Sequence, residues 1–410
     1  MYAVRAPHAF DGERFVAGGA TVLVEDGVIR GIEPHGYPVP EGTEVLDHPD
    51  ATLLPGLIDT HTHLIGDGGL GALDRVETYT DAEIDAVMTR ALHRQLAAGV
   101  TTVRDLGDRG FCAVDRRDRQ RADPAAVRLE PRILASGPPI TSPRGHCWNM
   151  RGEVDGPDGI RAAVAERADR GVDVVKVMAS GGMATQGTDV FGAQFSHDDL
   201  QLLVDLSHAA GLGLTAHAHS LVAVETALDV RADGIEHCSC LTPEGPRLTP
   251  AVVERLATSG TSVCLTLGLD VALMATMTPP PQMRAVMERL GLDAMSFRRS
   301  RLEATGTLAA AGVRLLTGVD SGIAPMKPHG FVSRSVADHV EAGMPVASAV
   351  AAATSVSTDA LGVGALTGRL RAGLAADLLV VAGDLSTDVD ALTRVQRVVL
   401  RGVPVATLGP

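Results

Sequence analysis

Short apolar runs separated by turns dominate both ends of the chain. Residues 1–55 alternate such runs with Gly, Pro and acidic residues, and an Asp-Gly pair separates the runs 20–24 and 28–32. Asp-Gly between two apolar runs is a strong signal for a β-hairpin. The runs 376–381 and 395–400 have the same character. Neither end has enough strand to close a core alone, so we expect the two ends to combine in one small β-sandwich domain.

Between these ends, strand-like runs alternate with amphipathic helical segments. The strand pattern recurs eight times, at 57–64, 100–104, 132–136, 172–178, 212–217, 234–237, 262–265 and 313–317. Helical periodicity fills several intervals, at 81–98, 160–170, 198–210 and 297–311. Eight β/α alternations indicate an α/β fold of the parallel (β/α)8 TIM barrel type. We therefore predict a barrel over 56–365 and a β-sandwich domain over 1–55 and 366–410.

The first barrel strand carries two histidines. His61 and His63 are two residues apart on the run 57–64, so both side chains point to one face of the strand. Their Cα atoms would lie roughly 6–7 Å apart, a separation that suits two imidazoles binding one metal ion. A His-x-His pair is common on strands, however, and alone it does not establish a metal site.

Four later strands end in ionisable residues that are unusual in a buried apolar strand. These residues are Lys176, His217 with His219, His237 and Asp320. In a TIM barrel the strand ends meet at the C-terminal mouth, where catalytic groups lie. Ionisable groups gathered there would repel or stay unpaired unless a cation joined them, so the set predicts a metal centre. Taken singly, each also fits a structural role as a core histidine, a turn aspartate or a lysine that reaches solvent.

Lysine usage strengthens this interpretation. The chain has over thirty arginines but only two lysines, Lys176 and Lys327. Since Arg serves wherever a positive charge is sufficient, the lysine within an apolar strand suggests chemistry that a guanidinium cannot perform.

Charge and cysteine content exclude several classes of function. The net charge of −14 argues against nucleic acid as a partner, because phosphate binding needs a basic surface. The sequence has no signal-peptide pattern and no apolar run of the ~18 residues needed to cross a bilayer. We therefore expect a cytoplasmic protein with no membrane partner. We also expect it to act on a small molecule and to form a homo-oligomer. The five scattered cysteines favour buried free thiols over a disulfide framework, and Cys238 and Cys240 lack the second pair of a zinc knuckle.

Taken together, the motifs resemble the amidohydrolase superfamily over nearly the full chain. The matching residues are 55–63, Lys176, His217, 234–237 and 318–320. Residues 175–182 and 194–196 are similar to the prolidase-type branch, whose members hydrolyse dipeptides or N-acyl amino acids. Relatives of that branch include imidazolonepropionase-like and organophosphate-cleaving enzymes. The resemblance implies two divalent metal ions, usually Zn²⁺, bridged by a lysine that CO2 has carboxylated.

Carried over by position, the resemblance also implies the ligands of each ion. One ion would be held by His61, His63 and Asp320, the other by His217 and His237, and both by the carbamate of Lys176. A carbamate supplies two oxygens and a negative charge, which a free ammonium does not.

The expected reaction is hydrolysis of an amide bond in a dipeptide or N-acyl amino acid by a metal-bridged hydroxide. Asp320 would take the proton of the water and pass it to the leaving nitrogen. The same centre would also serve a cyclic amide or imidazolone, a lactone or a phosphotriester. A non-enzymatic scaffold is the remaining alternative, but none of the ligands is missing.

Two more histidines are candidate catalytic residues. His146, in the loop after the third strand, matches a substrate-contacting histidine of the prolidase-type branch, with an exposed loop residue as the alternative. His219 lies on the same strand face as His217. Many relatives have Tyr at that position, where it is thought to stabilise the tetrahedral oxyanion; His could also donate there, but the change leaves substrate preference open.

Loop residues supply the last candidates. Arg144 or Arg151 could bind a substrate carboxylate through two hydrogen bonds, or could be a solvated loop arginine. The Met-rich segment 270–282 contains three consecutive prolines and could form either part of a lid or an ordinary loop.

Overall fold

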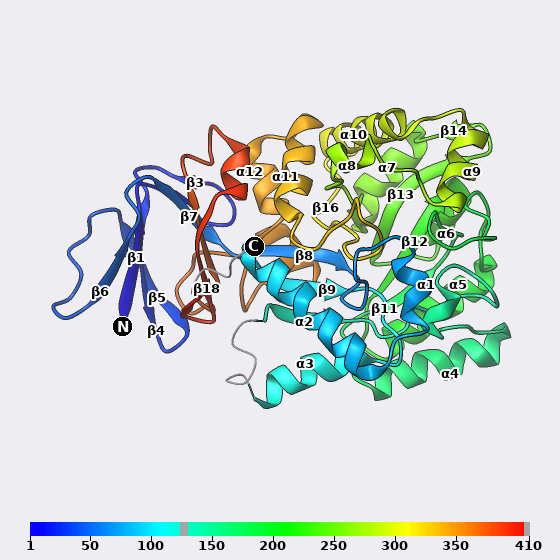
Figure 1. Cartoon of the computed structure of the whole chain (residues 1–410), viewed down its shortest axis with the longest axis horizontal. Coiled ribbons are helices and arrows are strands. Elements are labelled where there is room, and N and C mark those ends of the chain that lie inside the picture. The colour runs from blue at the N-terminus through cyan, green and yellow to red at the C-terminus, as the bar shows by residue number, and fades with distance from the viewer. Residues whose placement is uncertain (124–129, 406–410) are drawn as a thin grey trace.

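The computed structural model describes residues 1–123 and 130–405. Figure 1 shows a small all-β part, which contains the N-terminus, beside a larger part in which helices surround a barrel of strands. The predicted fold class, a (β/α)8 barrel with a small β-sandwich formed from both ends of the chain, is confirmed. The residue boundaries given above for the two domains remain a prediction.

Two sheets form the β-sandwich. One has the order β5-β4-β1-β6 and contains β1 (Tyr2–Ala6), β4 (Ala20–Glu25), β5 (Val28–Pro34) and β6 (Glu44–Asp47). The other has the order β19-β18-β17-β7-β2-β3 and contains β2 (His8–Phe10), β3 (Phe15–Val16), β7 (Ala51–Pro55), β17 (Leu378–Ala382), β18 (Val395–Leu400) and β19 (Val403–Val405). Strand β17 pairs antiparallel with β7, which joins the two ends of the chain. Apolar residues of both sheets, such as Val22, Leu53 and Leu378, pack in one buried cluster.

Eight parallel strands form the barrel, and each coincides with a predicted run. They are β8 (Leu57–Thr62), β9 (Val100–Asp105), β10 (Arg132–Ala135), β11 (Val175–Met178), β12 (Leu214–Ser220), β13 (Gly234–Thr242), β15 (Ser262–Cys264) and β16 (Leu315–Leu316). Regular pairing gives the orders β10-β9-β8 and β11-β12-β13-β15-β16. Parallel bridges from Ile140 to Val177 and from Thr62 to Ser321 connect these two groups, so the barrel closes. The short β14 (Gly245–Pro246) pairs with the end of β13.

Helices cover the outside of the barrel and part of its mouth. They are α1 (Ala72–Val76), α2 (Asp81–Ala97), α3 (Cys112–Ala122), α4 (Gly156–Asp169), α5 (His197–Ala209), α6 (Leu221–Asp229), α7 (Pro250–Ser259), α8 (Val271–Met274), α9 (Pro281–Leu290), α10 (Ala294–Ala310), α11 (Val332–Glu341), α12 (Val346–Ala352) and α13 (Ser355–Ala360). The 3-10 turns are η1 (Trp148–Met150) and η2 (Val389–Thr393). Thr80 and Glu83 form a capping box that begins α2 where the sequence pattern predicted.

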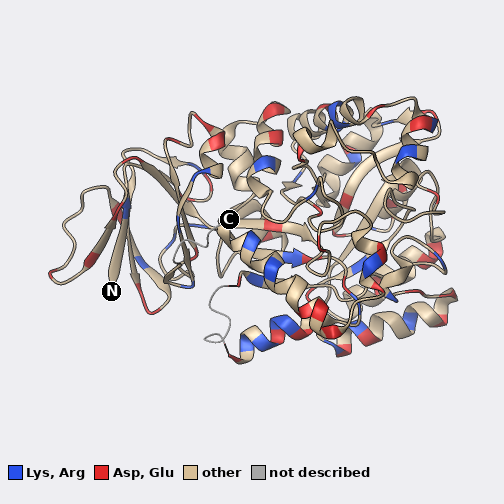
Figure 2. Ribbon diagram, in the orientation of Figure 1, with Lys and Arg blue, Asp and Glu red and all other residues tan. Residues whose placement is uncertain are grey.

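The outer helices carry the charged residues expected of surfaces that face solvent. Acidic and basic residues are interspersed along α3 and α4 in Figure 2. Within the described part of the chain, no helix has the length and apolar character needed to cross a membrane. The five cysteines are free thiols, as predicted.

One buried aspartate fixes the strand that carries the first two histidines. The Asp59 carboxylate accepts hydrogen bonds from the backbone N–H groups of His61 and Val319 and from the side chains of Gln95 and Ser321. Buried carboxylates need such partners, because an unpaired charge is costly to bury. Asp59 therefore ties β8, α2 and the segment after β16 together at the edge of the candidate site.

Candidate metal centre

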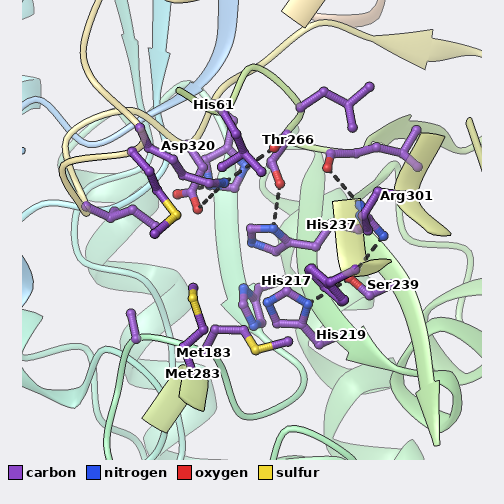
Figure 3. A pocket seen from close by; sticks show the side chains of 18 of the residues that line it. His61, Met183, His217, His219, His237, Ser239, Thr266, Met283, Arg301 and Asp320 are labelled. Atoms are coloured by element: carbon purple, nitrogen blue, oxygen red, sulfur yellow. Dashed lines mark hydrogen bonds and ion pairs between the residues drawn. The ribbon is translucent and has the colours of Figure 1, made fainter. Parts of the chain in front are cut away.

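The predicted residues of the first and last barrel strands meet at the mouth of the barrel (Figure 3). The ligand atoms of His61, His63 and Asp320 all lie within 4.8 Å of one another. Asp320 Oδ1 lies 3.4 Å from His61 Nε2 and 3.2 Å from His63 Nε2. All three side chains are buried. One oxygen and two nitrogens thus point at a common position, as a metal site requires.

A second group lies beside the first. It consists of His217, His219 and His237, whose ligand atoms also lie within 4.8 Å of one another. The ring centroids of His217 and His237 are 4.5 Å apart, and that of His61 is 5.2 Å from that of His237. The structure therefore joins the two predicted sets in one centre, and it places His219 next to the two histidines predicted for the second ion.

Hydrogen bonds orient the rings of the first group. His61 Nδ1 lies 2.8 Å from Glu236 Oε2, and His63 Nδ1 lies 3.0 Å from the carbonyl oxygen of Gly107. Both partners accept a hydrogen bond, so each ring keeps its proton on Nδ1 and presents the lone pair of Nε2 to the site. This tautomer leaves Nε2 of both rings free to bind a metal ion.

The second group is held in a similar way. His237 Nδ1 lies 2.9 Å from Thr266 Oγ1, which leaves Nε2 facing the site. His217 is reversed, because its Nε2 lies 3.2 Å from the carbonyl oxygen of Gly181 and its Nδ1 is left for a ligand. His219 Nδ1 lies 2.9 Å from Ser239 Oγ, which in turn accepts a hydrogen bond from Arg301 at 3.0 Å.

A buried ion pair lies behind the first group. Glu236 is 1% exposed, and its Oε1 accepts hydrogen bonds from Arg104 at 2.8 Å and from Thr215 at 2.7 Å. Burial raises the pKa of Glu236, but Arg104 and His61 outweigh burial and hold that pKa well below its usual range. Cys264 also lies within ligand distance of His61 and Glu236. Because both oxygens of Glu236 already accept hydrogen bonds, this third group does not form an open ligand set.

Lys176 is the most unusual residue of the site. Its side chain is 1% exposed, and its Nζ has no hydrogen-bond partner within the described residues. Burial is the main cause that lowers the pKa of Lys176, which favours the neutral amine. A neutral, unpartnered amine in a pocket of imidazoles fits a carbamate, since only the uncharged amine reacts with CO2. Together with the imidazoles and a carboxylate it forms a donor set suited to divalent ions such as Zn²⁺.

Burial keeps most of the histidines neutral. It lowers the pKa of His61 to about 4 and the pKa values of His217 and His237 well below 6.5. Burial also lowers the pKa of His63, but the Asp320 carboxylate outweighs it and the net shift is upward. Burial opposes ionisation of Asp320, yet Lys327 and the two histidines hold its pKa far below the usual range. His61, His217 and His237 are therefore neutral and Asp320 is ionised near neutral pH, as cation binding requires, whereas His63 must lose the proton that Asp320 favours before it can bind a cation.

Two candidate ligands have a left-handed backbone. The φ angle is 67° at His237 and 65° at Asp320, values that residues other than Gly rarely adopt. Each such conformation costs on the order of 1–3 kcal/mol, and such conformations cluster at functional sites. This conformation occurs within β13 for His237 and after the end of β16 for Asp320, and both side chains line the pocket.

The loop candidates have different outcomes. His146 is 6% exposed, and its ring centroid lies 4.5 Å from that of His217, so the exposed-loop alternative is wrong. Its role as a substrate contact remains a prediction. Arg144 and Arg151 are exposed, and neither lines the pocket above the histidines. The Arg144 guanidinium stacks over Trp148 at 4.2 Å from the ring centroid.

Some residues of the site had no predicted role. Glu236 belongs to a predicted strand, and a charged residue within that buried run was a usable signal. Ser239 and Thr266 carry no such signal, because a hydroxyl residue near a strand end is common. Arg301 is one of three arginines within four residues on α10, and its burial depends on packing that the sequence pattern does not show.

The chain matches the model of the Amidohydrolase family over residues 52–405. Imidazolonepropionase of Salinispora arenicola (strain CNS-205) is 27% identical over 310 residues, which cover 68% of this chain and 70% of that protein. Ochratoxinase of Aspergillus niger is 26% identical over 365 residues, 81% of this chain and 70% of that protein. A crystal structure of a Xaa-Pro dipeptidase with methionine in its active site has a TM-score of 0.85 at 23% identity, over 98% of this chain and 99% of that one. The chain therefore belongs to the amidohydrolase family.

Proposed function

We propose that this amidohydrolase cleaves an amide bond of a small molecule with two metal ions bound at the mouth of its barrel. The observation that carries the proposal is the buried Lys176 amine, which lines the same pocket as His61 and His217 and has no hydrogen-bond partner among the described residues. A structural lysine would be expected to reach solvent or an anion. A carbamate formed on Lys176, placed between the two groups of ligands, would account for this buried position of the side chain.

The proposed ligands follow the two groups of side chains. His61, His63 and Asp320 would hold one ion, His217 and His237 the other, and carboxylated Lys176 both. Two bound divalent ions would lower the pKa of a water molecule and polarise a substrate carbonyl.

Asp320 is the proposed proton carrier. Its Oδ1 faces His61 and His63, while its Oδ2 accepts a hydrogen bond from Lys327 Nζ at 3.2 Å. The contact with Lys327 fixes the carboxylate in one orientation. Asp320 would accept a proton from the attacking water and deliver it to the leaving nitrogen as the C–N bond breaks.

His219 is proposed as a donor to the developing oxyanion. Since Arg301 donates to Ser239 Oγ, the Ser239 hydroxyl proton is available for His219 Nδ1. That hydrogen bond favours the tautomer with its proton on Nε2, the nitrogen that faces the pocket. An Nε2–H group can stabilise negative charge but cannot bind a metal, which separates His219 from His217 and His237.

The test combines metal analysis with a substrate panel. The purified protein should contain up to two divalent ions per chain and should hydrolyse amides only when they are bound. The first panel contains N-acyl amino acids with Xaa-Pro and Xaa-Arg dipeptides; a second contains a cyclic amide, a lactone and a phosphotriester. Full amide turnover after exhaustive chelation would contradict the proposal.

A further inference from the structure

The pocket above the histidines is lined mainly by apolar side chains. Seven of its lining residues are methionines: Met178, Met183, Met274, Met277, Met283, Met287 and Met326. Leu73, Leu267, Ile323 and Phe297 add to this surface. Methionine side chains are flexible and polarizable, so a wall of this kind adapts to apolar groups of different shape.

One segment supplies most of this wall. Met274, Met277, Met283 and Met287 all belong to the stretch between β15 and α10, which forms α8 and α9. Residues 270–282 are therefore part of a cover over the site rather than an ordinary loop. The cover packs on the loop after β11 through an apolar cluster that includes Met183, Val286 and Phe191.

Hydrogen bonds fix the cover in place. Gln282 Nε2 donates to the carbonyl oxygen of Thr188 at 2.9 Å, and Gln282 Oε1 accepts from the backbone N–H of Gly187 at 3.3 Å. The guanidinium of Arg289 lies over the Phe191 ring, 4.4 Å from its centroid. These contacts all attach the cover to the loop after β11, which holds the apolar wall over the site.

The cations that line the pocket already have partners. Arg301 donates to Ser239 Oγ and to the carbonyl oxygens of Leu265 and His237. Arg298 forms ion pairs with Asp338 at 2.6 Å and with Glu341 at 2.5 Å.

The same holds for the lining lysines and for the second lining carboxylate. Lys327 is paired with Asp320. Lys176 is assigned to the proposed metal centre, so within the described lining every other side-chain cation already has a partner. Asp338 also accepts from Arg334 and from the backbone N–H of Gly268, so a substrate ammonium finds no free carboxylate there.

We infer that the substrate is an amide whose groups on both sides of the scissile bond are uncharged and largely apolar. The inference rests on the proposed amide hydrolysis. A carboxylate placed against the methionine wall would lose water without gaining a counter-charge, which disfavours its binding. Lys327 Nζ already donates to Asp320 Oδ2 at 3.2 Å and to the carbonyl oxygen of Thr266 at 3.3 Å, so a carboxylate bound there would compete for its charge with Asp320, the proposed proton carrier. The predicted N-acyl amino acid class is therefore the competing class in the test.

A matched pair of anilides separates charge from shape. N-(4-methylphenyl)acetamide and 4-acetamidobenzoate differ mainly by a methyl group in place of a carboxylate. With the zinc-loaded protein we expect kcat/KM for the neutral member to exceed that of the anion by at least about tenfold. An equal value, or a preference for the anion, would overturn the inference and leave the proposed hydrolysis intact.

Binding measurements keep the test decisive if neither anilide is cleaved. Failure to cleave any amide with two zinc ions bound would remove the proposed function. Calorimetry on the metal-free protein would then still compare the two ligands, with the neutral one expected to bind at least about tenfold more tightly. Equal or weaker binding of the neutral ligand would overturn the inference by itself.

Substitution of one wall residue supplies the converse test. Met283→Arg places a guanidinium on α9 beside the histidines (Figure 3), so the preference should shift toward the anion by at least about tenfold. Met283→Leu, the matched control, should keep the preference of the wild type. Circular dichroism verifies that both variants are folded. A folded Met283→Arg variant with the wild-type preference would contradict the assigned position of the substrate.

Discussion

Glu236→Gln tests whether the buried ion pair behind the candidate metal centre holds His61 in place. The substitution keeps the size of the side chain but removes its charge, and it replaces one acceptor oxygen with an NH2 donor. That donor must face either His61 Nδ1 or the groups of Arg104 and Thr215, which donate hydrogen bonds in the wild type. The variant therefore loses an acceptor and leaves the buried Arg104 charge without its partner.

Glu236→Gln should have two separate effects, one on the stability of the fold and one on metal affinity. Breaking one side of a buried ion pair costs about 3–5 kcal/mol, so the free energy of unfolding of the metal-free protein should fall by that amount. Arg104 keeps its hydrogen bond to the carbonyl oxygen of Thr60, which places the loss toward the lower figure. Loss of the partner that orients a metal-binding histidine weakens metal affinity by about 10–100-fold. Only the ion assigned to His61 should be affected.

Urea unfolding followed by circular dichroism measures the first effect, and competition with a chromophoric zinc chelator measures the second. Glu254→Gln on α7 is the control, because that glutamate is exposed and such substitutions usually change stability by less than about 0.5 kcal/mol. If Glu236→Gln were within about 1 kcal/mol of the wild type and bound zinc equally well, Glu236 would not have the role assigned to it.

Three other predictions address the same centre. The pKa of Glu236 is held below its ordinary value of 4.5, so the contribution of its charge to stability is complete above pH 4.5 and is lost as the pH falls below it. The difference in unfolding free energy between the wild type and Glu236→Gln should therefore shrink in acid. A difference that stays constant with pH would contradict the assigned charge. Lys176→Ala should lose activity and bind less zinc, and short carboxylic acids should restore part of the activity. The wild type should show a carbamate signal by NMR after incubation with labelled bicarbonate. An active Lys176→Ala variant would exclude a bridging carbamate at this position. His219→Phe should keep two zinc ions while kcat falls about 10²–10³-fold, whereas His217→Ala should lose one ion; loss of an ion from His219→Phe would make His219 a ligand instead.

The barrel strands and their helices were predictable because each leaves a local pattern. An apolar run such as 234–237, followed by turn residues and a segment with helical periodicity, predicts one β/α unit without any knowledge of its tertiary neighbours. The exact ends of the strands were harder to predict from the sequence. For example, β13 continues to Thr242 through residues that show no alternating apolar pattern. The combination of both chain ends in one β-sandwich followed from a shortage of strands at each end.

The candidate metal ligands could be grouped from the sequence because the fold itself collects them. Once a parallel barrel is established, all strand ends lie at one mouth, so His61 and Asp320 become neighbours although 259 positions separate them. The hydrogen-bond partners of the ligands could not be found in this way. Arg301 reaches Ser239 from a helix, and nothing in the spacing of α10 distinguishes it from the exposed Arg299.

In the proposed function, substrate selection depends on contacts between loops that follow different strands. The segment 270–282 had the composition of either a lid or a loop, because its prolines and methionines are compatible with both. What decides between them is the cluster that joins Met283 and Val286 of α9 to Met183, a contact between segments about a hundred residues apart. A single-segment pattern cannot encode such a contact. The proposed metal ligands would limit the reaction to hydrolysis of a polarised bond, and this cover would set the groups that flank that bond. Relatives with the same ligands and different covers should therefore differ in substrate.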